Sequence, residues 1–228
     1  MWQKGFRFVA GLDEAGRGPL AGPVVAAAVI IKNYDLKIFN KDFKGINDSK
    51  KLSEKQREYF YKILTKNKNI KWGIGIVSEK VIDKINILEA TKLAMLKAIV
   101  SLRGARGPLW GRRGNLEYVH KPLDCFAAAR NDESMFLLVD GNFSLKIGLP
   151  EKSVVKGDQK VVSISAASII AKVTRDRIME KYDKKYPQYG FKRHKGYPTL
   201  AHRNTLKKIG PCPIHRKTFF PVSTLHKA

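Results

Sequence analysis

The chain has 228 residues, which suits one domain with a sizeable core, and its hydrophobic fraction of 43% is that of an ordinary globular protein. Its 44 Lys and Arg against 20 acidic residues give a formal net charge of +24, which favours a polyanionic partner such as nucleic acid. We expect no membrane association, because no apolar run spans a bilayer and no signal-peptide core is present. The two cysteines are too few to stabilise a small secreted fold by disulfides, which indicates a cytoplasmic setting.

Short apolar runs rich in Val and Ile, each bounded by Gly or Pro, predict buried strands in the first third of the chain. These runs are residues 7–13, 23–31 and 70–77. Before the third run, Ser53 and Gln56 have the spacing of a capping box, which predicts the start of a helix. Asn86 and Glu89 form a second cap pair and predict a helix over residues 87–102.

A fourth strand is predicted over residues 135–139, directly before Asp140-Gly141-Asn142. A long helix is expected over residues 162–185, because Pro187 cannot continue it. A last helix over residues 201–209 is closed by Gly210. Strands that alternate with helices indicate an α/β sheet.

Residues 103–134 differ from the rest of the chain in their basic residues. They hold five of the thirteen Arg but only one of the thirty-one Lys, and their Gly, Pro and Trp residues break any periodicity. We interpret this segment as a surface insertion, which a core tolerates because loop-closure entropy grows slowly with length. An ordinary long loop is the alternative, although unstructured loops of this length are uncommon in compact domains.

Four acidic residues stand where strands end or within the long helix. They are Asp13, Glu14, Asp140 and Asp176. Strand ends in an α/β sheet gather at one edge, and a buried carboxylate pair needs a proton or a cation to neutralise it. Carboxylate oxygens suit Mg²⁺ or Mn²⁺, and two such ions about 4 Å apart can activate a water and stabilise a leaving oxygen in phosphodiester cleavage.

Each of these acids also has a purely structural interpretation. Asp140-Gly141-Asn142 alone is a good turn signal, and Asp176 can simply pair with Lys172 one helical turn earlier. Asp13 and Glu14 are harder to explain in this way, because a solvated pair rarely follows so apolar a strand, and they converge only if the chain bends nearby. The set is therefore more informative than its members.

Gly16 and Gly18 flank Arg17 and allow main-chain groups to approach a ligand closely, because no Cβ intervenes. With Ala21 they match the pattern G-x-G-x-x-A, which suggests a dinucleotide site. Pro19 and the strand that follows exclude that interpretation, since the motif requires a helix at this point.

Basic residues indicate phosphate contacts in two further places. Lys50 and Lys51 precede the capped helix, where a phosphate could meet both the lysines and the helix N-terminus, although a solvated basic loop is equally consistent. From Lys172 onward there are fifteen Lys or Arg against three acidic residues, as on a nucleic-acid surface. Aromatic residues lie among these charges at Tyr189, Phe191 and Tyr197. We expect most of them to pack and one or two to touch a sugar or base.

Taken in chain order, these motifs resemble those of the ribonuclease HII family. The similarity runs from residue 10 to about residue 219, except for residues 103–134, which have no counterpart in the family pattern. The residues that carry it are Asp13-Glu14-Ala15-Gly16-Arg17-Gly18-Pro19, Asp48-Ser49-Lys50-Lys51-Leu52, Val139-Asp140-Gly141-Asn142, Lys156-Gly157-Asp158, Ser165-Ala166-Ala167-Ser168-Ile169-Ile170-Ala171-Lys172-Val173, Arg175-Asp176 and His194-Lys195-Gly196-Tyr197-Pro198-Thr199.

The resemblance implies a ribonuclease H-like α/β fold, with a central mixed sheet of five strands flanked by helices and a helical C-terminal part. Residues 1–228 would then be one catalytic domain that carries the insertion on its surface, with activity intact. The implied reaction is endonucleolytic cleavage of RNA paired with DNA, including ribonucleotides embedded in duplex DNA, which leaves a 3′-hydroxyl and a 5′-phosphate. We expect the protein to act as a monomer.

The resemblance also assigns roles to individual residues. The implied catalytic and metal-binding set, for Mn²⁺ or Mg²⁺, is Asp13, Glu14, Asp140 and Asp176. The backbone of Gly16, Arg17 and Gly18 would read the 2′-hydroxyl at the RNA–DNA junction, and Tyr197 would contact the sugar that follows. This agrees with the physical argument, because only the 2′-hydroxyl distinguishes RNA from DNA at a single nucleotide.

Two other functions fit parts of the sequence. One is a non-catalytic nucleic-acid binder whose insertion has disrupted the site. The other is a two-metal nuclease or strand transferase of the same fold that acts on DNA alone. The presence of all four acids favours the hybrid endonuclease, because charge alone explains none of their positions.

Overall fold

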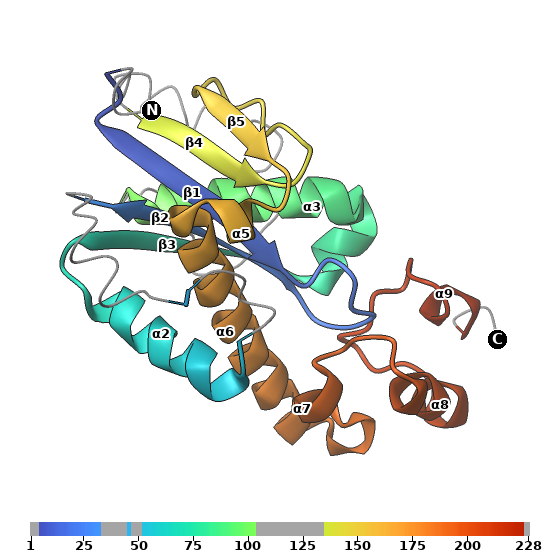
Figure 1. Ribbon diagram of the computed structural model, residues 1–228. Helices are drawn as coiled ribbons and strands as arrows, with labels where there is room; N and C mark the ends of the chain where they lie inside the picture. Colours follow the sequence, from blue (N-terminus) through green and yellow to red (C-terminus); the bar gives the residue numbers. More distant parts are fainter. Residues whose placement is uncertain (1–4, 33–44, 47–51, 104–134, 226–228) are drawn as a thin grey trace.

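The computed structural model describes residues 5–32, 45–46, 52–103 and 135–225, and within them five strands form one sheet in the order β3-β2-β1-β4-β5 (Figure 1). The strands are β1 (Phe8–Ala15), β2 (Val24–Ile31), β3 (Ile70–Val77), β4 (Met135–Asp140) and β5 (Glu151–Val154). β2 runs antiparallel to both β1 and β3, whereas β1, β4 and β5 run parallel to one another. The predicted mixed α/β sheet of five strands is therefore confirmed.

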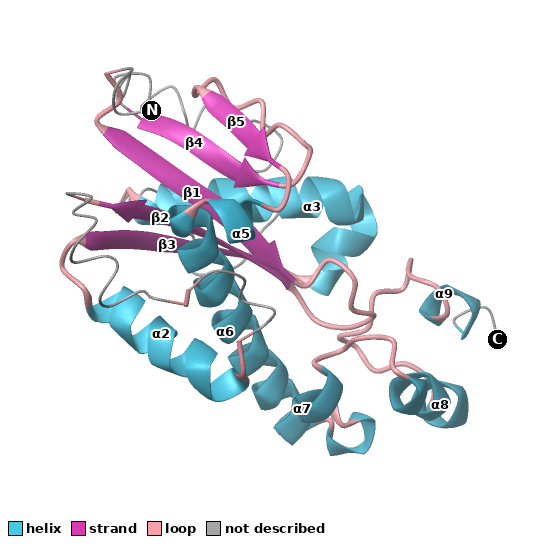
Figure 2. Cartoon of the chain, viewed as in Figure 1, coloured by secondary structure: helices cyan, strands magenta, loops and turns pink. Residues whose placement is uncertain are grey.

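Helices cover both faces of the sheet (Figure 2). α3 (Glu79–Leu102) packs on one face, and α2 (Glu54–Lys66) and α6 (Val162–Lys185) pack on the other. Alternate residues of β2 point to opposite faces, so Ala26 belongs to the apolar cluster with α3 and Ala27 to the cluster with α6. This two-sided burial explains why β2 reads as a continuous apolar run.

Glycines set how closely two helices approach the sheet. A Cβ built on Gly75 of β3 would lie 1.9 Å from the carbonyl oxygen of Ala94 in α3. A Cβ on Gly11 of β1 would lie 2.3 Å from the backbone carbon of Ser163, at the start of α6. The close contact at Gly11 fixes α6 over the end of β1, where the first acidic pair lies.

The C-terminal part contributes short helices that group beyond the end of β1 (Figure 1). They are η3 (Pro187–Tyr189), α7 (Phe191–His194), α8 (Leu200–Ile209) and α9 (Val222–Leu225). A third apolar cluster joins Phe191 and Leu206 of these helices to Leu20, which follows β1. The loop after β1 is therefore part of the C-terminal core.

Local signals predicted several elements well. The long helix has the predicted bounds, and Ser53 and Gln56 form the capping box at the start of α2. Asn86 caps the predicted helix with bonds of 2.9 and 3.1 Å to the N–H groups of Leu88 and Glu89, but a further helical turn from Glu79 precedes it, so Asn86 lies at a kink with φ of 66°. The periodicity of the residues missed β5 and the four-residue helix α5 (Gly157–Lys160). Residues 104–134, Lys50 and Lys51 lie outside the described residues.

Candidate active site

Parallel pairing of β1 with β4 brings two of the predicted acids side by side. Leu12 pairs with Val139, so the next residues along the two strands are Asp13 and Asp140. Asp13 is only 5% exposed. Asp140 ends β4, and its Oδ1 accepts a hydrogen bond of 2.7 Å from the N–H of Gly157, where α5 begins. The backbone register of the sheet thus places both carboxylates at one edge.

The electrostatics around Asp13 disfavour a lone negative charge. Burial raises the pKa of Asp13 well above its ordinary value, and the negative charges of Glu14 and Asp140 raise it further. Hydrogen bonds from the Glu14 N–H and the Ser168 side chain act in the opposite direction but are weaker. Three carboxylates whose charges repel one another are stabilised by any cation that they share.

Glu14 leaves β1 on the opposite side of the pleat from Asp13, because the strand continues to Ala15 before the chain turns. Its Oε1 lies 3.3 Å from Nη1 of Arg17, and its side chain is 10% exposed. Glu14 is therefore close enough to Asp13 to influence its pKa, but its carboxylate is oriented by Arg17.

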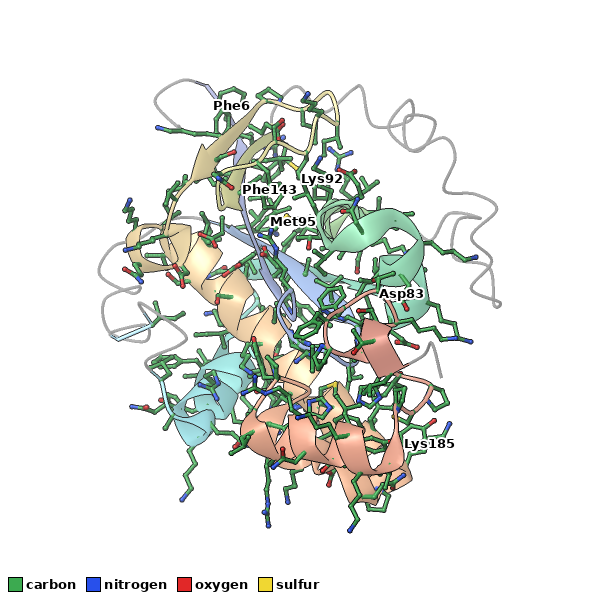
Figure 3. All side chains as sticks on the ribbon, turned by 90° about the vertical axis from the view of Figure 1, so that its right-hand side faces the viewer. Phe6, Asp83, Lys92, Met95, Phe143 and Lys185 are labelled. Atoms are coloured by element: carbon green, nitrogen blue, oxygen red, sulfur yellow. The ribbon has the colours of Figure 1, made fainter. Side chains whose placement is uncertain are left out.

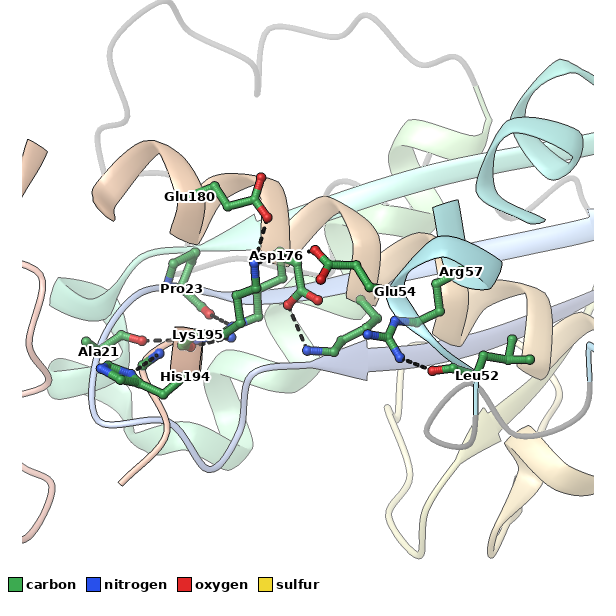
Figure 4. Close-up of polar contacts among 12 residues, drawn as sticks. Ala21, Pro23, Leu52, Glu54, Arg57, Asp176, Glu180, His194 and Lys195 are labelled. Carbon is green, nitrogen blue, oxygen red and sulfur yellow. Dashed lines mark hydrogen bonds and ion pairs between the residues drawn. The ribbon is translucent and has the colours of Figure 1, made fainter. Parts of the chain in front are cut away.

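Asp176 of α6 has a different partner. Its Oδ1 lies 2.7 Å from Nζ of Lys172, the ion pair that the sequence left open as an alternative (Figure 4). It is not among the groups that raise the pKa of Asp13. Within the described residues, no three His, Cys, Asp or Glu side chains are arranged to hold a metal ion. The structure thus joins Asp13, Glu14 and Asp140 electrostatically and leaves Asp176 paired with lysine.

The loop after β1 brings the predicted recognition residues together. Gly16 has φ of +101°, and a Cβ there would lie 2.2 Å from Nε of Arg175, so both the backbone conformation and the space require glycine. A Cβ on Gly18 would lie 3.7 Å from the ring of Tyr197, which is 42% exposed. The glycine loop and Tyr197 thus adjoin each other, although 179 positions separate Gly18 from Tyr197 in the sequence.

Two buried arginines hold this loop, and the sequence indicated a role for neither. Arg175 donates hydrogen bonds to the carbonyl oxygens of Ala21, Pro23 and Lys195 (Figure 4). Arg216 donates to those of Gly16, Arg17 and Gly22. Arg175 lies in a family motif beside Asp176, which was the only available signal. Arg216 lies far along the chain and carries no local pattern.

The aromatic residues of the basic C-terminal part divide as expected. Tyr189 and Phe191 are buried in the third apolar cluster, and only Tyr197 of the three presents its ring to solvent.

Among the described residues, none of the helices is both long and apolar enough to cross a membrane.

Comparison with known proteins identifies the family. A family model described as Ribonuclease HII matches residues 10–106 and 142–222. The chain belongs to the ribonuclease HII family. The match to the ribonuclease HII model omits residues 107–141, which include most of the predicted insertion and also Asp140.

Relatives in this family cover nearly the whole chain. The ribonuclease HII of Chlamydia muridarum is 48% identical over 220 residues, which cover 96% of this chain and 85% of the relative. That of Acetivibrio thermocellus is 50% identical over 218 residues, covering 96% and 72%. The crystal structure of the ribonuclease H2 from Pyrococcus horikoshii is similar with a TM-score of 0.66 and 30% identity, covering 96% of this chain and 97% of that one.

Membership of the ribonuclease HII family establishes the general activity. The chain is a ribonuclease H, a hydrolase that cuts RNA paired with DNA, and this class of enzyme depends on a metal ion.

Proposed function

We propose that this chain is an endoribonuclease that incises duplex DNA at embedded ribonucleotides and also hydrolyses the RNA strand of RNA–DNA hybrids. The products carry a 3′-hydroxyl and a 5′-phosphate. The observation that carries this proposal is the position of Asp13, which is buried between the charges of Glu14 and Asp140 beside the Gly16–Arg17–Gly18 loop. We further propose that it acts as a cytoplasmic monomer.

The proposed ligands of Mn²⁺ or Mg²⁺ are Asp13, Glu14, Asp140 and Asp176. The chemistry of these donors suits such an ion, because all of them are carboxylate oxygens. Burial and then the like charges of Glu14 and Asp140 raise the pKa of Asp13, and a cation would neutralise those charges. Asp176 is paired with the ammonium group of Lys172, and a divalent ion bound here would displace that lysine from the carboxylate. Bound divalent ions would supply an activated water and stabilise the leaving oxygen.

Residues of the protein are proposed to recognise the nucleic acid directly. The backbone groups of Gly16, Arg17 and Gly18 are proposed to read the 2′-hydroxyl of the ribonucleotide, and the exposed ring of Tyr197 to contact the neighbouring sugar. Lys50 and Lys51 are proposed to bind a phosphate. The basic C-terminal part would bind the remaining backbone phosphates, with an affinity that falls as salt rises.

A duplex DNA with one ribonucleotide tests the proposal. With Mn²⁺ or Mg²⁺ present, we expect a single incision with a 3′-hydroxyl and a 5′-phosphate, and no incision in an all-DNA duplex of the same sequence. Binding without cleavage would instead support a non-catalytic nucleic-acid binder. Equal cleavage of the all-DNA duplex would indicate a nuclease that does not recognise ribonucleotides.

A further inference from the structure

Arg216 is fully buried and directs its guanidinium group at the loop after β1. Its Nη2 and Nη1 donate hydrogen bonds of 2.5 and 2.9 Å to the carbonyl oxygens of Gly16 and Arg17. Its Nε donates one of 3.0 Å to that of Gly22. One side chain from the end of the chain therefore orients three peptide groups of the loop.

These bonds also determine where the N–H groups of the loop point. A trans peptide is planar, and its N–H points away from the C=O of the preceding residue. Because the carbonyl oxygens of Gly16 and Arg17 point at Arg216, the N–H groups of Arg17 and Gly18 point away from it. Arg17 and Gly18 are both exposed, and Gly18 adjoins the ring of Tyr197, so these two donors face the side from which a nucleic acid would approach.

The surrounding structure fixes Arg216 in turn. Asp83 lies on α3 (labelled in Figure 3). Its carboxylate accepts hydrogen bonds of 2.9 and 3.0 Å from the N–H groups of Lys217 and Thr218, the two residues that follow Arg216. The N–H of Arg216 itself donates a bond of 2.8 Å to the carbonyl oxygen of Leu20. The backbone at position 216 is thus anchored to two separate parts of the fold.

Keeping two buried arginines next to one another is unfavourable for stability unless other groups compensate. Burial lowers the pKa of Arg216 to about 9, and the neighbouring positive charge of Arg175 contributes to that shift. Carbonyl oxygens partner both guanidinium groups, and each group uses its planar, forked set of donors to reach three of them. A lysine has a single ammonium nitrogen and cannot span the same oxygens.

We propose that Arg216 is a positioning residue for ribonucleotide recognition, which aims the N–H groups of Arg17 and Gly18 at the 2′-hydroxyl by holding the preceding carbonyl groups. The inference rests on the proposed function, since it assumes that this loop reads the 2′-hydroxyl. It assigns selectivity, rather than general affinity for nucleic acid, to a side chain that does not touch the substrate.

The experiment measures binding selectivity in an Asp140→Asn background, which prevents cleavage. The dissociation constants are determined for two duplexes of the same sequence, one all DNA and one with a single ribonucleotide. Selectivity is the dissociation constant for the all-DNA duplex divided by that for the duplex with one ribonucleotide. We expect Arg216→Lys to reduce this ratio by about fivefold or more, the effect of losing one or two hydrogen bonds. Affinity for the all-DNA duplex should change by less than about twofold, because surface charge determines it. Arg7→Lys, at an exposed position before β1, is the matched control and should change neither value.

Each outcome decides the question. Arg216→Gln is made in parallel, because its neutral amide keeps two N–H donors without burying a charge, and circular dichroism identifies which variants fold. A folded variant with unchanged selectivity overturns the proposal, as does an equal loss of affinity for both duplexes, which indicates a structural role alone. If the background protein itself does not distinguish the two duplexes, recognition of the 2′-hydroxyl by the proposed function fails, and the role of Arg216 fails with it.

Discussion

The two sides of the site are positioned by different kinds of interaction. The backbone register of neighbouring parallel strands places Asp13 beside Asp140. By contrast, buried arginine side chains from distant parts of the chain hold the adjoining glycine loop, and one of these is Arg216, 200 positions after Gly16. Substitutions at the sheet edge should therefore affect chemistry and leave the backbone intact, whereas changes in the C-terminal part should affect recognition.

The cores behind the two sides differ in the same way. Behind the strand ends that carry Asp13 and Asp140 lie two clusters of buried apolar side chains. Behind the loop, polar groups are buried as well: Nε2 of His202 lies 3.0 Å from Nε2 of His215, and Nδ1 of His202 lies 2.9 Å from the carbonyl oxygen of Tyr197. Neither of these two apolar clusters contains a histidine, so the loss of stability in mild acid that His202 causes is expected in the C-terminal part.

The largest expected effect is on turnover at the sheet edge. Asp13→Asn or Asp140→Asn should reduce kcat by about a thousandfold or more, because each removes a proposed ligand of the metal. Affinity for a hybrid should be nearly unchanged, since the basic surface supplies most of it. Asp13→Asn should also fold at least as stably as the native chain, because the amide removes a carboxylate whose charge is disfavoured there. Single-turnover cleavage and hybrid titrations measure both quantities.

A matched control for these variants is Glu89→Gln on α3, where the side chain is 49% exposed and its carboxylate pairs with Lys92. It should leave both turnover and affinity unchanged. A large loss of hybrid affinity in Asp13→Asn would contradict the separation of chemistry from binding.

The next largest effect distinguishes substitutions on the two faces of the sheet, at Gly11 against α6 and at Gly75 against α3. Gly11→Ala and Gly75→Ala each force a Cβ against helix backbone and should lower the free energy of unfolding by about 1–3 kcal/mol. Only Gly11→Ala displaces α6, which carries Asp176, so it alone should also reduce kcat in protein that is still folded. Urea denaturation and cleavage assays on both variants provide the comparison. Equal activity per folded molecule would show that the contact at Gly11 does not position α6.

A smaller effect is expected in acid. Burial lowers the pKa of His202 to about 4, whereas the unfolded chain binds a proton there near pH 6.5. Between these values the unfolded state holds the extra proton. The free energy of unfolding therefore decreases as the pH is lowered, by at most about 1.4 kcal/mol per pH unit for this one group. Urea denaturation from pH 7 to 4.5 measures the slope. In His202→Asn the slope should be shallower, and an identical slope would assign the acid sensitivity to other groups.

The smallest effect is expected from the predicted insertion. The residues on either side of 104–134 have their side chains in contact, since Nη2 of Arg103 is 3.9 Å from Sδ of Met135. Replacing residues 104–134 by a short Gly-Ser linker should therefore change kcat on a ribonucleotide-containing duplex by no more than about twofold. A many-fold rise or loss of activity would show that the segment acts on the site.

Local chemistry explains which features could be predicted from the sequence. Apolar runs and cap residues such as Ser53 mark their elements directly, and the same signals led to Asp13 and Asp140 through the strands that they end. β5 was missed because it is the outermost strand of the sheet. Its residues Glu151–Val154 are partly exposed and show no apolar periodicity. Arg216 was missed because its partners lie about 200 positions away, and contacts at that separation leave no pattern in either segment.

The most direct measurement is the anomalous scattering of Mn²⁺ in crystals of the protein. Asp13, Glu14, Asp140 and Asp176 are proposed to share divalent ions, so we predict Mn²⁺ bound by oxygens of Asp13 and Asp140, with Asp176 released from Lys172 to join them. Crystals that hold Mn²⁺ elsewhere, or none at this edge while the Asp176–Lys172 pair persists, would contradict the proposed metal site.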